Sequence, residues 1–194
     1  MTTNKRGNSI IEVMVVIIII TTGIIGAYTI LNSGQQLSIT SENRIKAINI
    51  AREGMEAVEN IRDTNWIKFS SDYTNCWRVK DYDVSCIGNT GKSFATGSYV
   101  LVQSGTLWFL SGATAFPVYI DARGLTSSSG SATMCSSTKT TDCKTIFDRE
   151  IQVSYPSDPD HMKINSIVTW TDSTKADKHS INLETILTNW KKKF

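Results

Sequence analysis

The first 31 residues constrain this chain more than any other stretch. Lys5-Arg6-Gly7 precedes a run from Ile10 to Leu31 in which Glu12 is the one charged residue. About 20 consecutive apolar residues in a helix cross the hydrocarbon core of a bilayer, so this run is long enough to be a membrane span. A charged side chain at the centre of a span costs roughly 2.5–3.5 kcal/mol on insertion scales. We therefore expect Glu12 to have a partner of opposite charge.

The same region predicts how the chain is oriented. An ordinary secretory signal is cut after its apolar run, next to small residues, and no A-x-A pattern follows Leu31. The run is therefore expected to stay on the protein as its anchor. Lys5 and Arg6 should remain in the cytoplasm, and the positive-inside rule then sends the rest of the chain outward. We predict a single-pass membrane protein whose globular part lies outside the cytoplasm.

Beyond Leu31 the pattern becomes amphipathic. Apolar residues recur at helical spacing, which predicts one face of a helix packed on a core; they are Leu37, Ile45, Ile48, Ala51, Met55 and Val58. The first proline of the chain is Pro117, so nothing forces a break after the span. The helix is expected to end near Asp63-Thr64-Asn65, where three residues that favour caps and turns follow one another.

The remainder of the chain reads as a sheet. Residues 98–103 and 106–110 flank Ser104-Gly105, which predicts a hairpin with a two-residue turn. Further strands are expected at 118–121, 147–154, 163–170 and about 179–188, and the Ser-, Thr- and Gly-rich stretch 125–141 as a surface loop. A long helix followed by a sheet predicts an α+β fold, with a mostly antiparallel sheet packed on the helix.

The four cysteines fall into two local pairs, Cys76 with Cys86 and Cys135 with Cys143. In an exported protein such pairs are typical of disulfides. The alternative is a zinc site, but the C-x2-C spacing is absent and both histidines lie outside the cysteine segments. We expect two disulfides, and no metal or cofactor.

Charge and motifs argue against several functions. The formal net charge is +2, and loss of Lys5 and Arg6 would bring the chain near neutrality, which disfavours a broad electrostatic nucleic-acid binder. Residues 88–93 end like a phosphate-binding loop, but Cys86 stands where the first glycine is required. No constellation of acid, base and nucleophile indicates an enzyme. The lysines at 191–193 are interpreted as a solvated tail, with anionic lipid, DNA or a glycan as alternative partners.

Several of these features together resemble the type IV pilin family, which includes minor pilins and the pseudopilins of type II secretion. They are the leader Lys5-Arg6-Gly7, a cut before Asn8, Glu12 as the fifth residue after that cut, and an apolar run that turns amphipathic. Residues 51–62 are also similar to the corresponding region of PilV-like minor prepilins. The late strand segment 147–153 resembles the same group.

The resemblance implies a domain organisation and roles for three residues. Residues 1–7 would be the prepilin leader, 8–31 the membrane and filament-core helix, 32–63 its amphipathic continuation, and 64–194 the extracytoplasmic domain. Gly7 would precede the prepilin peptidase cut, and Asn8 would become the new N-terminus, which the family often methylates. Glu12 would pair with the N-terminal amine of a neighbouring subunit.

The resemblance also implies partners and a location. The partners would be other pilin subunits, the prepilin peptidase, the inner-membrane assembly platform, and membrane lipid before assembly; nucleic acid is not expected. After assembly the chain would lie in a pilus at the cell surface. One residue departs from the family, which usually has Phe at the first mature position, where this chain has Asn8. The alternatives are a secretion pseudopilin, a DNA-uptake pilin, and a membrane-anchored surface adhesin or enzyme.

Overall fold

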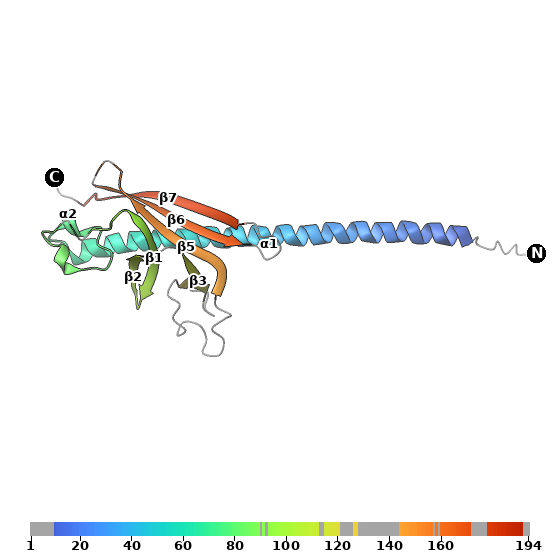
Figure 1. The fold of residues 1–194 in the computed structure, drawn as a ribbon, viewed down its shortest axis with the longest axis horizontal. Coiled ribbons are helices and arrows are strands. Elements are labelled where there is room, and N and C mark those ends of the chain that lie inside the picture. The colour runs from blue at the N-terminus through green and yellow to red at the C-terminus, as the bar shows by residue number, and fades with distance from the viewer. Residues whose placement is uncertain are drawn as a thin grey trace, which may run out of the picture. The chain divides into compact units, whose positions relative to one another are not determined.

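The structure is a computed structural model. It describes residues 10–89, 91, 93–112, 115–120, 126–127, 144–156, 158, 160–171 and 178–191. The chain divides into two compact units, Met1–Arg44 and Ile45–Phe194, here called unit 1 and unit 2. Each unit is described by itself (Figure 1).

One long helix, α1 (Ile10–Lys68, 59 residues), begins in unit 1 and ends in unit 2. The prediction that it ends near Asp63-Thr64-Asn65 is wrong by a turn. Asn65 is fully buried, and its side-chain amide donates to the backbone carbonyls of Val79, at 2.7 Å, and Trp77, at 3.4 Å. Because the amide bonds to a neighbouring segment and not to its own backbone, it does not terminate the helix.

The predicted α+β fold is confirmed. The strands of unit 2 form a seven-stranded sheet in which every recorded pairing is antiparallel. They are β1 (Gly97–Ser104), β2 (Leu107–Gly112), β3 (Phe116–Ile120), β4 (Thr126–Ser127), β5 (Lys144–Ser154), β6 (His161–Thr171) and β7 (Lys178–Thr188). The hairpin around Ser104-Gly105 is β1 and β2, and Gly105 takes the positive φ of 62° that its turn requires.

Strand β5 organises the sheet (Figure 1). It pairs with β6 along one side, in register from Phe147↔Trp170 to Ser154↔Lys163. On its other side it pairs with β3 near its beginning and with β1 near its end. β7 pairs with β6 over its whole length. Successive residues of β6 alternate between buried and partly exposed positions. The strand therefore turns one apolar side toward the core and one mostly polar side away from it.

The core of unit 2 lies between α1 and the apolar side of the sheet. The helix buries mostly small side chains there: Ala47, Ile50, Ala51, Gly54, Ala57, Val58 and Ile61. Ala51 and Val58 were predicted for this face, but Leu37 and Ile45 were assigned to it wrongly, since both are exposed. The face of α1 that packs on the sheet is distinguished by the small size of its side chains, because small residues let the helix backbone come close to β5 and β6.

Helix and sheet lie in close contact at Gly54. A Cβ atom added to Gly54 would lie 2.5 Å from Ser166 Oγ on β6 and 3.0 Å from Ile151 Cδ1 on β5. Real Cβ atoms are essentially never found 2.5 Å from a neighbour, so any larger residue at this point would force its surroundings to shift. Glycine within a helix costs up to about 1 kcal/mol relative to alanine. At Gly54 the contact with the sheet offsets this cost.

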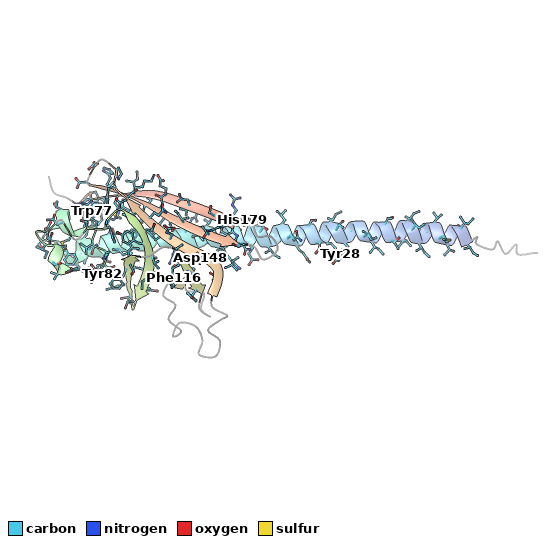
Figure 2. The ribbon with its side chains drawn as sticks, viewed as in Figure 1. Tyr28, Trp77, Tyr82, Phe116, Asp148 and His179 are labelled. Atoms are coloured by element: carbon cyan, nitrogen blue, oxygen red, sulfur yellow. A yellow bond between two sulfur atoms is a disulfide. The ribbon has the colours of Figure 1, made fainter. Side chains whose placement is uncertain are left out.

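Two short helices follow α1 at its C-terminal end, α2 (Tyr73–Cys76) and η1 (Val84–Cys86). The two cysteines that were predicted to pair lie in these helical turns, Cys76 in α2 and Cys86 in η1. Both turns begin with an aspartate cap, because Asp72 accepts from the amide of Asn75 and Asp83 from the amide of Ser85. Trp77 and Tyr82 lie in this part of unit 2 (Figure 2).

Candidate functional site

The feature with the clearest functional chemistry is the N-terminal part of α1 in unit 1. The 18-residue window of highest mean hydropathy, 2.6, is not buried at all within the protein. Its large apolar side chains are exposed on every side of the helix, as Tyr28 illustrates in Figure 2. A helix that is apolar all round is stable only in lipid or among other helices. By length and composition this is a helix that could cross a membrane.

Glu12 is the acidic residue in the first turn of this helix. Within the part of the chain that the structure describes, its carboxylate makes no ion pair or hydrogen bond. The position is favourable for a carboxylate, because the N-terminal end of a helix carries a partial positive charge. A charged group on an otherwise apolar helix, with no partner in its own described chain, is expected to find one in another molecule.

The threonines within the apolar run hydrogen-bond to the backbone of their own helix. Thr21 donates to the carbonyl of Ile17 at 2.9 Å, and Thr22 to that of Ile18 at 2.9 Å. Such back-bonding shields a hydroxyl from hydrocarbon, which would otherwise cost several kcal/mol for an unpaired polar group. The run is therefore compatible with lipid along its length, and Glu12 is its one charged exception.

The sequence of this segment matches a known signature. Residues 2–28 match the prokaryotic N-terminal methylation motif. This motif is the leader of type IV pilins, and its match supports a type IV pilin-like protein. Such a leader implies, in general terms, processing by a prepilin peptidase and assembly with other pilins. Together with the apolar helix, which begins inside the matched residues at Ile10, the motif fits a membrane-anchored protein with an exported domain. No curated protein and no solved structure matches the chain.

Of the residues predicted to act, Glu12 lies on the described helix and Gly7 and Asn8 lie outside the described residues. The structure joins Cys76 to Cys86 in a disulfide with a Cα–Cα distance of 5.2 Å, which confirms the first predicted pair. Cys135 and Cys143 also lie outside the described residues, so their pairing stays a prediction. Among the described residues, no group of three or more His, Cys, Asp or Glu side chains is arranged to hold a metal ion.

The disulfide joins the two short helices α2 and η1, which follow the C-terminal end of α1. Asp72 Oδ2 accepts hydrogen bonds from the backbone amide of Gly88 and from the side chain of Asn75, both at 2.8 Å. The bond from Gly88 makes the largest contribution to lowering the pKa of Asp72 below its ordinary value. Gly88 takes a positive φ of 72°, a conformation that glycine adopts without strain.

The stretch that resembled a phosphate-binding loop has another structure. Val79 and Ser93 form an isolated antiparallel bridge, and the next regular element is the strand β1. A phosphate-binding loop of that type leads from a strand into a helix. The described part of this stretch therefore lacks the required helix N-terminus.

Sequence reasoning missed the polar contact that secures the helix to the sheet. Arg149 on β5 is 1% exposed, and its guanidinium donates to the backbone carbonyl of Ile50 at 3.3 Å and pairs with Glu53 at 3.7 Å. Burial lowers the pKa of Arg149, and the carboxylate of Glu53 opposes that shift. A signal was present, because Arg149 shares its strand parity with the apolar residues at 147, 151 and 153.

Proposed function

We propose that this chain is a structural subunit of a type IV pilus, a minor pilin, with no catalysis of its own. Residues 1–7 form a leader that prepilin peptidase removes after Gly7. Residues 8–31 hold the subunit in the inner membrane, with the globular part outside the cytoplasm, and then join the core of the filament. The observation that carries this proposal is the methylation motif at residues 2–28, within which a helix begins at Ile10 whose N-terminal part is apolar on every side.

Glu12 is the proposed assembly residue. Cleavage after Gly7 creates an amine at Asn8, which the methylation motif suggests is then methylated. A carboxylate and an amine that are each costly in lipid are much less costly together. An unassembled subunit therefore keeps an unpaired Glu12 in the membrane, and docking beside a neighbour's amine relieves this cost and sets the axial position of the subunit.

The first test is processing. We expect co-expression with a prepilin peptidase to yield a mature chain whose N-terminal residue, read by Edman sequencing or mass spectrometry, is Asn8. Gly7→Glu should block the cut, because a large charged side chain obstructs the residue before the scissile bond. Gly23→Ala is the matched control, since a Cβ at Gly23 meets open space. A mature end anywhere else would remove the basis of the proposal.

The second test concerns the pairing of Glu12. Glu12→Gln preserves the size of the side chain and removes its charge, so it should leave processing intact and reduce incorporation into filaments at least tenfold. Glu56→Gln, on the exposed side of the same helix, should leave incorporation unchanged. If the Glu12 variant enters filaments as well as the wild-type chain, the pairing role is wrong.

The methylation motif does not separate a pilin from a type II secretion pseudopilin. Deletion of the gene separates them, because a minor pilin is required for piliation and a pseudopilin for protein secretion. We expect pilus number on the cell surface, measured by electron microscopy or shearing, to fall in the deletion strain while secretion continues. Loss of secretion with normal piliation would favour the pseudopilin.

A further inference from the structure

The C-terminal end of α1 in unit 2 carries exposed apolar side chains that filament assembly through the N-terminal helix does not explain. Ile67 is 77% exposed, Val84 66%, Ile87 49% and Trp190 68%. They come from three different segments, namely the last turn of α1, the short helix η1 with the residue after it, and the end of the chain. Several large apolar groups exposed together mark an interaction surface more often than chance does.

Contacts between these segments hold the exposed groups around one end of the unit. The disulfide joins η1 to α2. Lys68 on α1 lies over the ring of Tyr82 at 4.4 Å, just before η1. Trp190 meets Trp66 edge-on, with ring centroids 5.1 Å apart. Figure 1 shows α2 at this same end, where Figure 2 labels Trp77 and Tyr82.

Trp190 is presented on a fixed backbone. The preceding residue, Asn189, is buried, and its backbone amide donates to the carbonyl of Asp160 at 2.9 Å. Its side-chain amide donates to the carbonyl of Tyr73 at 2.9 Å, and its side-chain oxygen accepts from the indole of Trp66 at 3.2 Å. Because the chain is ordered before any ligand binds, the entropy cost of using Trp190 as an anchor is low.

Cations lie beside the pair of rings formed by Trp66 and Trp190. The Lys191 ammonium lies 5.4 Å from the ring centroid of Trp190 and 5.2 Å from that of Trp66, and the Arg62 guanidinium lies 4.6 Å from Trp66. The sequence continues with Lys192, Lys193 and Phe194. Tryptophan with lysine and arginine beside exposed aliphatic groups is the composition of the membrane–water interface, where rings sit among headgroups and cations attract anionic lipid.

We propose that this end of unit 2 binds the surface of an anionic lipid bilayer. Trp190 and Ile67 enter the headgroup region and Lys191 pairs with a lipid phosphate, while Arg62 stays paired with Asp63. The near-neutral charge of the whole chain disfavours a polyanion held by charge alone, whereas a bilayer uses the apolar groups and the cations together. This contact is separate from the proposed span at residues 8–31 and does not depend on it.

The test uses a chain that begins at Gly34, which removes the apolar run. The buried core residues that the structure describes all lie from Ala47 onward, so this chain retains that core. Its binding is measured by co-sedimentation with vesicles of phosphatidylglycerol and phosphatidylcholine at equal proportions, and with phosphatidylcholine alone. We expect binding to the anionic vesicles and at least tenfold weaker partitioning to the neutral ones.

Variants locate the contact. Trp190→Ala and Ile67→Ser should each weaken binding to the anionic vesicles at least fivefold. Lys191→Glu should do so by a similar factor, because one cation near an anionic surface contributes about 1 kcal/mol, or roughly fivefold. Ile186→Ser and Lys178→Glu are the matched controls, since they change an exposed isoleucine and an exposed lysine on β7 and should leave binding unchanged.

Three outcomes would overturn the proposal: no binding to anionic vesicles, equal loss in the β7 controls, or unchanged binding in both apolar variants. A further test adds a single-stranded oligonucleotide or a polyglutamate peptide as a competitor. If the competitor displaces the chain from the vesicles and binds it more tightly than they do, the surface belongs to another partner and the proposal is also overturned. Ile67→Ser decides the matter if Trp190→Ala unfolds, as judged by circular dichroism. Processing at Gly7 in the full chain is a separate readout, so failure of the proposed function would be recognised independently.

Discussion

The guanidinium of Arg149 donates to the backbone carbonyl of Ile50 at 3.3 Å, from a strand to the helix that covers it. Arg149 Cδ would lie 3.2 Å from a Cβ at Gly54, so the arginine reaches the helix backbone by passing over the glycine. The absence of a side chain at Gly54 therefore has two effects. It lets the helix approach the sheet, and it leaves room for a buried cation that joins the two.

Substitution of Gly54 tests the first effect. Gly54→Ala should destabilise unit 2 by about 1–3 kcal/mol, although alanine is the better helix former, because its Cβ would lie 2.5 Å from Ser166 Oγ. The free energy of unfolding from urea titration is the measurement. Gly34→Ala, where a Cβ meets open space, should not destabilise the protein, and a cost equal to that at Gly54 would contradict the steric explanation.

Ser166 offers an independent check of the same contact. Its hydroxyl is buried and has no hydrogen-bond partner among the described residues, so Ser166→Ala should be neutral or slightly stabilising. Removing Oγ also removes the atom nearest to an alanine at position 54. In the double variant Gly54→Ala/Ser166→Ala, the loss in the free energy of unfolding should be smaller than the sum of the two single effects. A double-mutant cycle measures this difference. Simple additivity would show that the clash is not with this hydroxyl.

The buried ion pair predicts an asymmetry between its two partners. Glu53→Ala leaves the cation of Arg149 buried without its nearest carboxylate, which should cost about 1–3 kcal/mol. In the background of Arg149→Met, which fills a similar volume without charge, the same change at Glu53 should cost much less. Thermal and urea unfolding of the four chains measure this coupling. An equal cost in both backgrounds would mean that Glu53 acts through packing and not through Arg149.

The disulfide is expected to stabilise the end of unit 2. Cys76 and Cys86 are separated by 10 residues in the sequence. A cross-link that closes a loop of this size restricts the unfolded chain, and this loss of entropy raises the free energy of unfolding by about 3 kcal/mol. The double variant Cys76→Ser/Cys86→Ser should lose a free energy of unfolding of that order, and reductant should lower its unfolding midpoint less than that of the wild-type chain. A midpoint of the wild-type chain that is insensitive to reductant would contradict this role.

Asp72 predicts a dependence of stability on acid pH. Its folded pKa is lowered, chiefly by the hydrogen bond from Gly88, so its contribution is present above the ordinary pKa of about 3.9 and is lost as pH falls through the folded pKa. Asp72→Asn should therefore flatten the unfolding free energy between about pH 5 and pH 2 relative to wild type. Glu56→Gln serves as the comparison, and an identical acid response in the Asp72 variant would refute the assignment.

Much of the fold was predicted from local pattern. The α+β class, the hairpin at Ser104-Gly105, the late strands and the Cys76–Cys86 pair follow from period, turn chemistry and spacing, which are properties of neighbouring residues. The end of α1 was misplaced because Asn65 favours a turn only when its amide bonds to its own backbone. In the structure that amide bonds to Val79 and Trp77 instead, and the preference disappears.

The face of α1 that meets the sheet could not be predicted in the same way. Hydrophobicity favoured Leu37 and Ile45, yet the contact is made by alanines and Gly54. How closely two elements approach depends on the side chains of both, and the residues that set the distance at Gly54 lie on strands about a hundred positions further along the chain. The polar contact of Arg149 with the helix depends on the same approach.

The sequence by itself determined how the N-terminal part of this protein is interpreted, because a basic pair, one carboxylate and an apolar run are recognised from composition and spacing and need no tertiary contact. Only the tertiary structure decided how unit 2 is held together and what its surface offers. Close packing at Gly54, burial of Arg149 and the presentation of Trp190 by Asn189 each require residues distant in sequence to meet. The stabilising free energy of these contacts arises only when the distant segments come together, so no single segment of the sequence reveals it.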